Sequence, residues 1–344
     1  MSISLAPAGT PGADALLADP AWLPHRLLDG GRTVRFVHAP RAAHQAATFL
    51  DDDGLKGAEM RQLPVTAVRG FGEGPEPGFV FHSAFCCSTL LARALDIPGV
   101  SMGFKEPAIL NDMAALQRSG HQVAALLPPV LALLGRPLAA GEHNVLKPSN
   151  VANALIAPLL AAAPGSRAIL LYAPLREFLV SVATKGLWGR IWMRRLFAML
   201  RSTPAFEPGF TDADLFTQSD LQIAALAWLQ HQKQFARLLP EYGDRLRTLD
   251  SRTLLSQREA TLVAVAAHLR LPIAPEAVVE RLQPGVFTEH SKRLGERYDP
   301  ERRQREQHVA EAAHAGEIDM VVTWATAIAR QFDVPLELDR ALLP

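Results

Sequence analysis

The sequence has no excess of either charge, since its 344 residues include 35 basic and 35 acidic side chains. Proteins that bind nucleic acid carry a basic excess, so this balance argues against such a partner. With 49% apolar and 20% charged residues, the composition excludes an intrinsically disordered chain and is that of a globular protein. The length allows one large domain or two small ones, with a substantial core.

Long apolar segments are also missing. The richest, residues 123–135 and 154–163, are short and contain proline, whereas a membrane-spanning helix needs about 20 consecutive apolar residues. Residues 1–19 lack the basic start and apolar run of a signal peptide. The two cysteines, Cys86 and Cys87, are adjacent, and ring strain disfavours a structural disulfide between neighbours. We therefore expect a soluble cytoplasmic protein without a membrane span.

Metal-binding patterns are absent too. The 11 histidines show no spacing such as H-E-x-x-H, so we expect no metal site. Lysine is scarce, with six lysines against 29 arginines. Against this arginine bias, a lysine in a motif-like loop is informative, although surface scatter remains the alternative for any one of them. Four of the six lysines fall in or near such loops: Lys105, Lys147, Lys185 and Lys292.

Short apolar segments alternate with helical patterns from residue 79 onward. We expect strands at 79–81, 100–104, 144–147, 167–172 and 245–249, and helices at 88–95, 108–135, 151–162 and 176–185. Strands that alternate with helices indicate a parallel sheet with crossover helices. The sequence therefore predicts a three-layer α/β fold, with a mostly parallel central sheet flanked by helices and a helical C-terminal part.

The first 75 residues predict an N-terminal appendage to a domain formed by residues 76–344. The boundary between them, residues 71–78, contains three glycines and two prolines and indicates a loop or linker. Within the appendage we expect three elements: a helix over 13–28 interrupted by Pro20 and Pro24, a strand over 33–38 and a short helix over 42–50.

Residues 79–95 place a strand, a loop of mostly small residues, Ser88-Thr89 and a helix in succession. Such a loop directs backbone N–H groups and the helix dipole toward one point, which suits a phosphate. The alternative is an ordinary turn with Ser88 as the helix cap. The motif G-x-x-x-x-G-K-[ST] is absent, because Cys87 and Ser88 stand at its second glycine and its lysine. This absence disfavours a kinase or nucleotide triphosphatase of that type.

Three segments in succession resemble bacterial members of the P-loop sulfotransferase-like family. FVFHSAFCCSTLLARAL resembles the family's strand followed by P-[KR]-S-G-T-T-L-L, and FKEPAIL resembles its Lys/Arg-Glu-Pro segment. The third segment begins VLKPSN and ends APLREFLVS, and it resembles the family block that ends R-x-P-x-[DE]-x-x-x-S. The resemblance covers residues 78–335. It implies 3′-phosphoadenosine 5′-phosphosulfate as the sulfuryl donor and a hydroxyl or amine acceptor on a small molecule or peptide.

The resemblance also implies roles for individual residues. The 5′-phosphosulfate would contact the loop residues Ser83, Ala84, Phe85, Cys86, Cys87, Ser88 and Thr89. The 3′-phosphate would contact Ser181, with compensating cations from Arg176 and from Lys292 in a late basic segment. Glu106 would take the proton of the acceptor beside the cation of Lys105, with His82 as the second choice for the base. For Glu106, an ion pair at a strand end is the alternative.

Two cations of the family's donor site are missing, since its loop Lys/Arg falls on Phe85 and its 3′-phosphate Arg falls on Ala173. Three functions therefore stay open. The first is sulfuryl transfer, and the second is a binding or scaffold protein that has lost the transfer chemistry. A nucleotide-dependent phosphotransferase ranks last, because the loop lysine is absent. A redox role for Cys86-Cys87 also stays open. No pattern in the sequence sets the oligomeric state.

Overall fold

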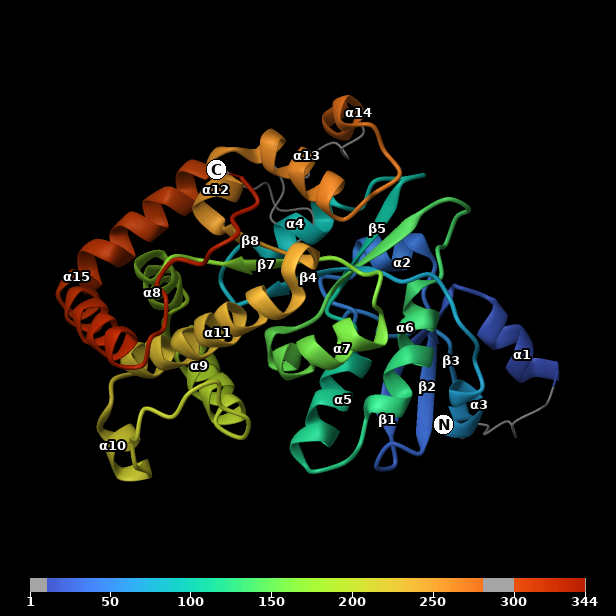
Figure 1. Ribbon diagram of the computed structural model, residues 1–344, viewed down its shortest axis with the longest axis horizontal. Helices are drawn as coiled ribbons and strands as arrows, with labels where there is room; N and C mark the ends of the chain where they lie inside the picture. The colour runs from blue at the N-terminus through green and yellow to red at the C-terminus, as the bar shows by residue number, and fades with distance from the viewer. Residues whose placement is uncertain (1–10, 281–299, 344) are drawn as a thin grey trace. The chain divides into compact units, whose positions relative to one another are not determined.

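The computed structural model describes residues 11–280 and 300–343 (Figure 1). Lys292, an expected donor contact, lies outside these residues. The described chain forms two compact units. The first comprises residues 11–81, 89–168 and 262–280, and the second comprises 82–88, 169–261 and 300–343. Within the described ranges, no helix combines the length and the apolar composition needed to cross a membrane.

A parallel five-stranded sheet confirms the expected α/β class. Its strand order is β5-β6-β4-β7-β8. The bounds are β4 (Gly78–His82), β5 (Ser101–Lys105), β6 (His143–Lys147), β7 (Ala168–Tyr172) and β8 (Leu246–Asp250). Every residue of β4, β5 and β7 is buried, which explains why the central residues of these strands show no alternation of apolar and polar side chains. The expected positions of all five strands are confirmed to within two residues.

In the first unit, β5 and β6 pair in register from Ser101 opposite His143 to Lys105 opposite Lys147. Gly103 of β5 lies against the helix α4 (Ser88–Ala94), where an added Cβ would be 1.9 Å from the Ala92 carbonyl oxygen. The expected helical stretch 108–135 is divided between α5 (Ala108–Arg118), a short 3₁₀ helix (Ala124–Leu126) and α6 (Leu127–Gly135). This unit also contains a 3₁₀ helix (Asn150–Leu155), α7 (Ile156–Ala162) and α14 (Pro275–Glu280).

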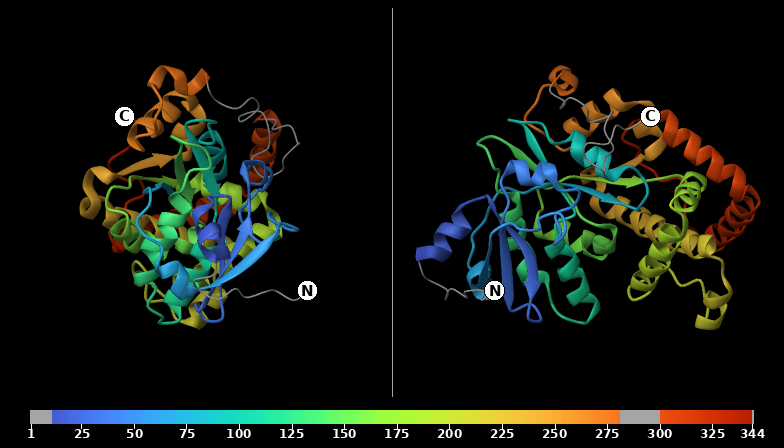
Figure 2. Two further views of the ribbon diagram at one scale, coloured as in Figure 1. Left: turned by 90° about the vertical axis from the view of Figure 1, so that its right-hand side faces the viewer. Right: turned by 180° about the vertical axis from the view of Figure 1, so that it is seen from behind.

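The first unit also contains an antiparallel three-stranded sheet, in the order β1-β2-β3, visible in blue in Figure 2. Its strands are β1 (Trp22–Leu28), β2 (Thr33–His38) and β3 (Met60–Pro64). The helices in this part of the chain are α1 (Pro11–Ala18), α2 (Arg41–Ala46) and α3 (Val65–Arg69). The expectation of a helix over 13–28 is therefore wrong beyond residue 18. Asp29, Gly30 and Gly31 all adopt positive φ angles, which close a hairpin and turn 22–28 into a strand paired with β2.

The second unit is mainly helical after β7, as expected for the C-terminal part. Its long helix α11 (Asp220–Tyr242) contacts α8 (Leu175–Thr184), α9 (Gly186–Leu200) and α15 (Pro300–Gln331). A capping box of Ser219 and Gln222 starts α11, and one of Thr211 and Asp214 starts α10 (Asp212–Thr217). The helix α12 (Ser251–Ser256) follows β8, and α13 (Arg258–His268) comes next in the chain.

Candidate functional site

The 83–87 loop connects the end of β4 at His82 to the start of α4 at Ser88, in the order that the sequence predicts. The Ser83 N–H donates to the Leu171 carbonyl of β7 at 3.1 Å, which fixes the start of the loop. The side chains of Phe85 and Cys87 are half-buried, whereas the other loop residues, together with Ser88 and Thr89, are buried.

Three non-glycine residues of this loop have left-handed backbones. The φ angles are 78° at Ala84, 49° at Phe85 and 65° at Cys87. Each such conformation costs an L residue about 1–2 kcal/mol, so the surrounding structure must hold it in place. A chain in which negative and positive φ angles follow one another directs successive N–H groups into a concavity that binds anions.

Two polar side chains at the start of the loop have different environments. The Ser83 hydroxyl is buried and has no hydrogen-bond partner within the described chain, so it is available to a ligand. His82 is also buried, and its Nδ1 accepts the Ala84 N–H at 3.2 Å. His82 therefore supports the turn of the loop. Cys86 and Cys87 are not joined in a disulfide, and the Cys86 thiol donates to the Leu171 carbonyl at 3.5 Å.

Apolar side chains, those of Phe85 and Ala173, occupy the two positions where the resembled family has cations. The ring of Phe85 lies against that of Phe178 on α8, with centroids 6.0 Å apart. Ala173 is buried, and its carbonyl accepts the indole N–H of the fully buried Trp228 at 2.8 Å. The loop residues could therefore hold a phosphosulfate only through N–H and hydroxyl groups. The two cations that the resembled family uses are replaced by Phe85 and Ala173.

The expected compensating cation Arg176 lies on α8 and is already paired. Its Nε donates to Glu311 at 2.9 Å and its Nη1 donates to Asp319 at 2.6 Å, both on α15. The hydrogen bonds to Asp319 and Glu311 raise the pKa of Arg176. A phosphate would have to compete with two carboxylates for this guanidinium. Ser181, on the same helix, is half-buried.

In the first unit, Glu106 and Lys147 meet at the ends of two neighbouring strands. The Glu106 N–H donates to the Lys147 carbonyl at 2.8 Å, and the Lys147 ammonium donates to Glu106 Oε1. The Lys147 side chain is 1% exposed and that of Glu106 is 20% exposed. Glu106 also has a left-handed backbone, with φ of 59°. The ion pair that the sequence analysis gave as the alternative role of Glu106 is therefore present, and its cation is Lys147.

Lys105, the expected partner of Glu106, points elsewhere. Its Nζ donates to the carbonyls of Gln45, at 3.3 Å, and of Ala47. The strand β5 ends at Lys105, and Glu106 has a left-handed backbone, so the side chains of these two neighbours contact different residues. Burial lowers the pKa of Lys105 to about 8, and the positive charges of Arg93 and Lys147 act in the same direction.

The described residues contain no group of three or more His, Cys, Asp or Glu side chains arranged to hold a metal ion. No family model matches the chain, and no curated protein matches it either. Among solved structures, it is similar to a sulfotransferase domain from the curacin biosynthetic pathway, with 13% sequence identity and a TM-score of 0.43. This similarity covers 74% of the present chain and 99% of the other. A likeness at this level does not establish a family or an activity.

Proposed function

We propose that the chain is a sulfotransferase-like enzyme. It would transfer a sulfuryl group from 3′-phosphoadenosine 5′-phosphosulfate to a hydroxyl or amine of a small molecule or peptide. The observation that carries the proposal is the 83–87 loop, with three strained non-glycine residues between a buried strand and a helix. Strain of this kind clusters at ligand sites. The succession of three family-like sequence segments supports a phosphosulfate as the ligand.

In this proposal the loop binds the donor mainly through neutral groups. The backbone N–H groups of residues 85–87 and the hydroxyls of Ser83, Ser88 and Thr89 would hold the 5′-phosphosulfate. Neutral hydrogen bonds are about half as strong as charge-assisted ones. The donor would therefore bind more weakly here than in a site with a lysine at position 85.

The chemistry assigned to Glu106 is general base catalysis. The acceptor oxygen or nitrogen forms a bond to sulfur while the bond between sulfur and the bridging oxygen of the donor breaks. The products are the sulfated acceptor and 3′-phosphoadenosine 5′-phosphate, and the acceptor proton passes to the Glu106 carboxylate. A base must be held in a fixed position, and the contact from Lys147 supplies that restraint.

A binding protein without transfer chemistry is the second candidate. The apolar side chains of Phe85, which packs on Phe178, and of the buried Ala173 favour it, because they stand at positions where the resembled family has cations. Such a protein would bind the spent donor but would not turn over. Wild type and Glu106→Gln separate the two candidates. In the enzyme, the substitution should abolish turnover while binding of 3′-phosphoadenosine 5′-phosphate survives, whereas a binding protein has no turnover to lose.

Calorimetric titration with 3′-phosphoadenosine 5′-phosphate, with ATP as the control ligand, tests the donor site. We expect micromolar binding of the former alone. Ser83→Ala should weaken it by about tenfold, the equivalent of one hydrogen bond. Ser119→Ala removes an exposed hydroxyl at the end of α5 and should have no effect. Binding of neither nucleotide contradicts the proposal, and binding of ATP alone would favour a phosphotransferase.

A further inference from the structure

The chain after α2 does not continue as the helix that the sequence predicts to residue 50. Residues 47–54, here called the strap, form backbone hydrogen bonds with the chain on both sides of Glu106. The Leu50 N–H donates to the Lys105 carbonyl at 2.7 Å, and the Leu50 carbonyl accepts the Ala108 N–H at 3.1 Å. Leu50 is fully buried. The strap is therefore hydrogen-bonded to the residues before and after the candidate base.

The strap also contacts both lysines at the strand ends. The Lys147 ammonium lies 5.4 Å from the centroid of the Phe49 ring, within the range of a cation–π interaction. The Ala47 carbonyl accepts from the Lys105 ammonium. Phe49 is half-buried, whereas Lys147 is fully buried. The ring of Phe49 thus adds a second contact to a cation that already holds Glu106.

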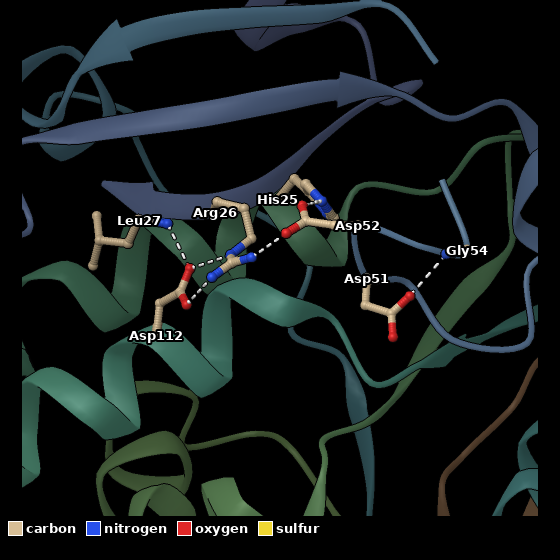
Figure 3. A network of polar contacts seen from close by, with 7 residues as sticks. All are labelled: His25, Arg26, Leu27, Asp51, Asp52, Gly54 and Asp112. Atoms are coloured by element: carbon tan, nitrogen blue, oxygen red, sulfur yellow. Dashed lines mark hydrogen bonds and ion pairs between the residues drawn. The ribbon is translucent and has the colours of Figure 1, made fainter. Parts of the chain in front are cut away.

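The C-terminal part of the strap is anchored to the antiparallel sheet, as Figure 3 shows. Asp52 accepts from Arg26 Nη1 and lies 2.9 Å from Nε2 of the buried His25. Arg26 also donates to both carboxylate oxygens of Asp112 on α5, at 2.8 and 2.9 Å. Asp112 in addition accepts the Leu27 N–H at 2.8 Å. Asp52 is therefore joined to β1, and β1 is joined to α5.

A tight turn holds the backbone of Phe49. Asp51 accepts the Gly54 N–H at 2.8 Å, which closes the turn (Figure 3). A Cβ added at Gly54 would lie 2.0 Å from the Phe49 carbonyl oxygen, too close for any side chain. Only glycine allows this approach, so the turn at residue 54 determines where the Phe49 backbone lies.

We propose that the strap is a positioning element for the Glu106–Lys147 pair, in which Phe49 covers Lys147 and the Asp52 anchor holds the strap in place. Residues that precede the sulfotransferase-like segments thereby become part of the site. The catalytic meaning of this inference rests on the proposed function, whereas the covering of Lys147 does not.

Labelling of lysines in the intact protein with a small amine-reactive reagent, quantified by mass spectrometry, tests the covering. Phe49→Ala should raise the labelling rate of Lys147 by at least about fivefold, because the covering ring is lost. Phe49→Tyr keeps the ring and should retain the wild-type rate. The exposed Lys185 is an internal reference whose rate should not change.

A second pair of variants keeps the Phe49 side chain. Gly54→Ala should displace the Phe49 backbone and raise Lys147 labelling, whereas Gly72→Ala adds a Cβ into open space and should not. Thermal unfolding of each variant distinguishes local opening from loss of the fold. Wild-type labelling of Lys147 in folded Phe49→Ala and Gly54→Ala would overturn the inference.

Turnover measurements separate this inference from the proposed function. With an acceptor in hand, Phe49→Ala should lower kcat and leave the KM for the donor unchanged, and Phe49→Tyr should restore kcat. Increased labelling without donor binding would retain the covering role and contradict the proposed function. Donor binding with unchanged labelling would support the proposed function and contradict the covering role of Phe49. A rise in donor KM without a fall in kcat would contradict a positioning role toward Glu106.

Discussion

Glu106 and Lys147 are joined twice, once through their side chains and once through the backbone, although they lie 41 positions apart in the sequence. The two partners differ in exposure, with 1% of the Lys147 side chain and 20% of the Glu106 side chain accessible. This difference determines how the pair responds to substitution. A carboxylate left alone here can hydrate, but an ammonium left alone stays buried.

Glu106→Gln should therefore destabilise the protein more than Lys147→Met. Loss of the carboxylate leaves a buried ammonium without its counter-charge, a change that costs about 3 kcal/mol or more. Lys147→Met leaves a partly hydrated carboxylate and keeps an apolar side chain of similar length, so its cost should be clearly smaller. Denaturant unfolding measures both. Equal losses would show that the burial of the two partners does not control their energetics.

The backbone strain of the 83–87 loop can be measured with a matched pair of glycine substitutions. Ala84 and Ala92 are both buried, and either substitution removes one methyl group and adds glycine flexibility to the unfolded chain. Only Ala84 has a positive φ. Ala84→Gly should thus be about 1–2 kcal/mol less destabilising than Ala92→Gly, which is the strain that glycine relieves. Indistinguishable free energies of unfolding would contradict a strained loop.

Elements set by local signals could be predicted from the sequence. The continuous apolar run before Tyr172 predicts β7, and the small residues that follow His82 predict the loop before α4. The position of Glu106 at the C-terminal end of a strand could be predicted because it follows an apolar segment. These features depend on neighbours in sequence, so the pattern of residue types is sufficient to find them.

Elements that depend on contacts between residues far apart in the sequence could not be predicted from the local pattern of residue types. The helical composition of residues 13–28 favoured a helix, and pairing with Thr33–His38 determined a strand instead. Phe49 carries no motif, and its place over Lys147 depends on the Asp52 anchor and on the turn at Gly54. The Asp-Gly-Gly sequence at 29–31 was the one local sign of the hairpin.

Phe85→Lys should strengthen binding of 3′-phosphoadenosine 5′-phosphate, because it restores the cation that the resembled family has in this loop. One charge-assisted hydrogen bond to a phosphate contributes about 1.5 kcal/mol or more, so the affinity should rise by about tenfold. Phe216→Lys is the control, since it adds the same charge at an exposed phenylalanine of α10. Calorimetry measures both. An equal gain from the two variants would indicate a nonspecific effect of charge and would contradict donor binding at the loop.

The pH dependence of stability should report the buried His44, whose ring lies 4.7 Å from that of Phe104. Burial, with the charges of Lys105 and Arg41, lowers the pKa of His44 to about 3 from 6.5. Below pH 6.5 the unfolded chain binds a proton that the folded protein does not, so stability falls as the pH falls toward 3. Between pH 6.5 and 4.5 this residue alone should remove about 2 kcal/mol of the free energy of unfolding.

His44→Gln should abolish that part of the acid sensitivity, whatever its own effect on stability at neutral pH. Its unfolding free energy should therefore decrease less than that of the wild type over the same two pH units. His121→Gln, at an exposed histidine, should follow the wild-type curve. Parallel curves for His44→Gln and wild type would mean that His44 takes up a proton as readily in the folded protein as in the unfolded chain. The contact between the His44 and Phe104 rings would then not keep water from the imidazole.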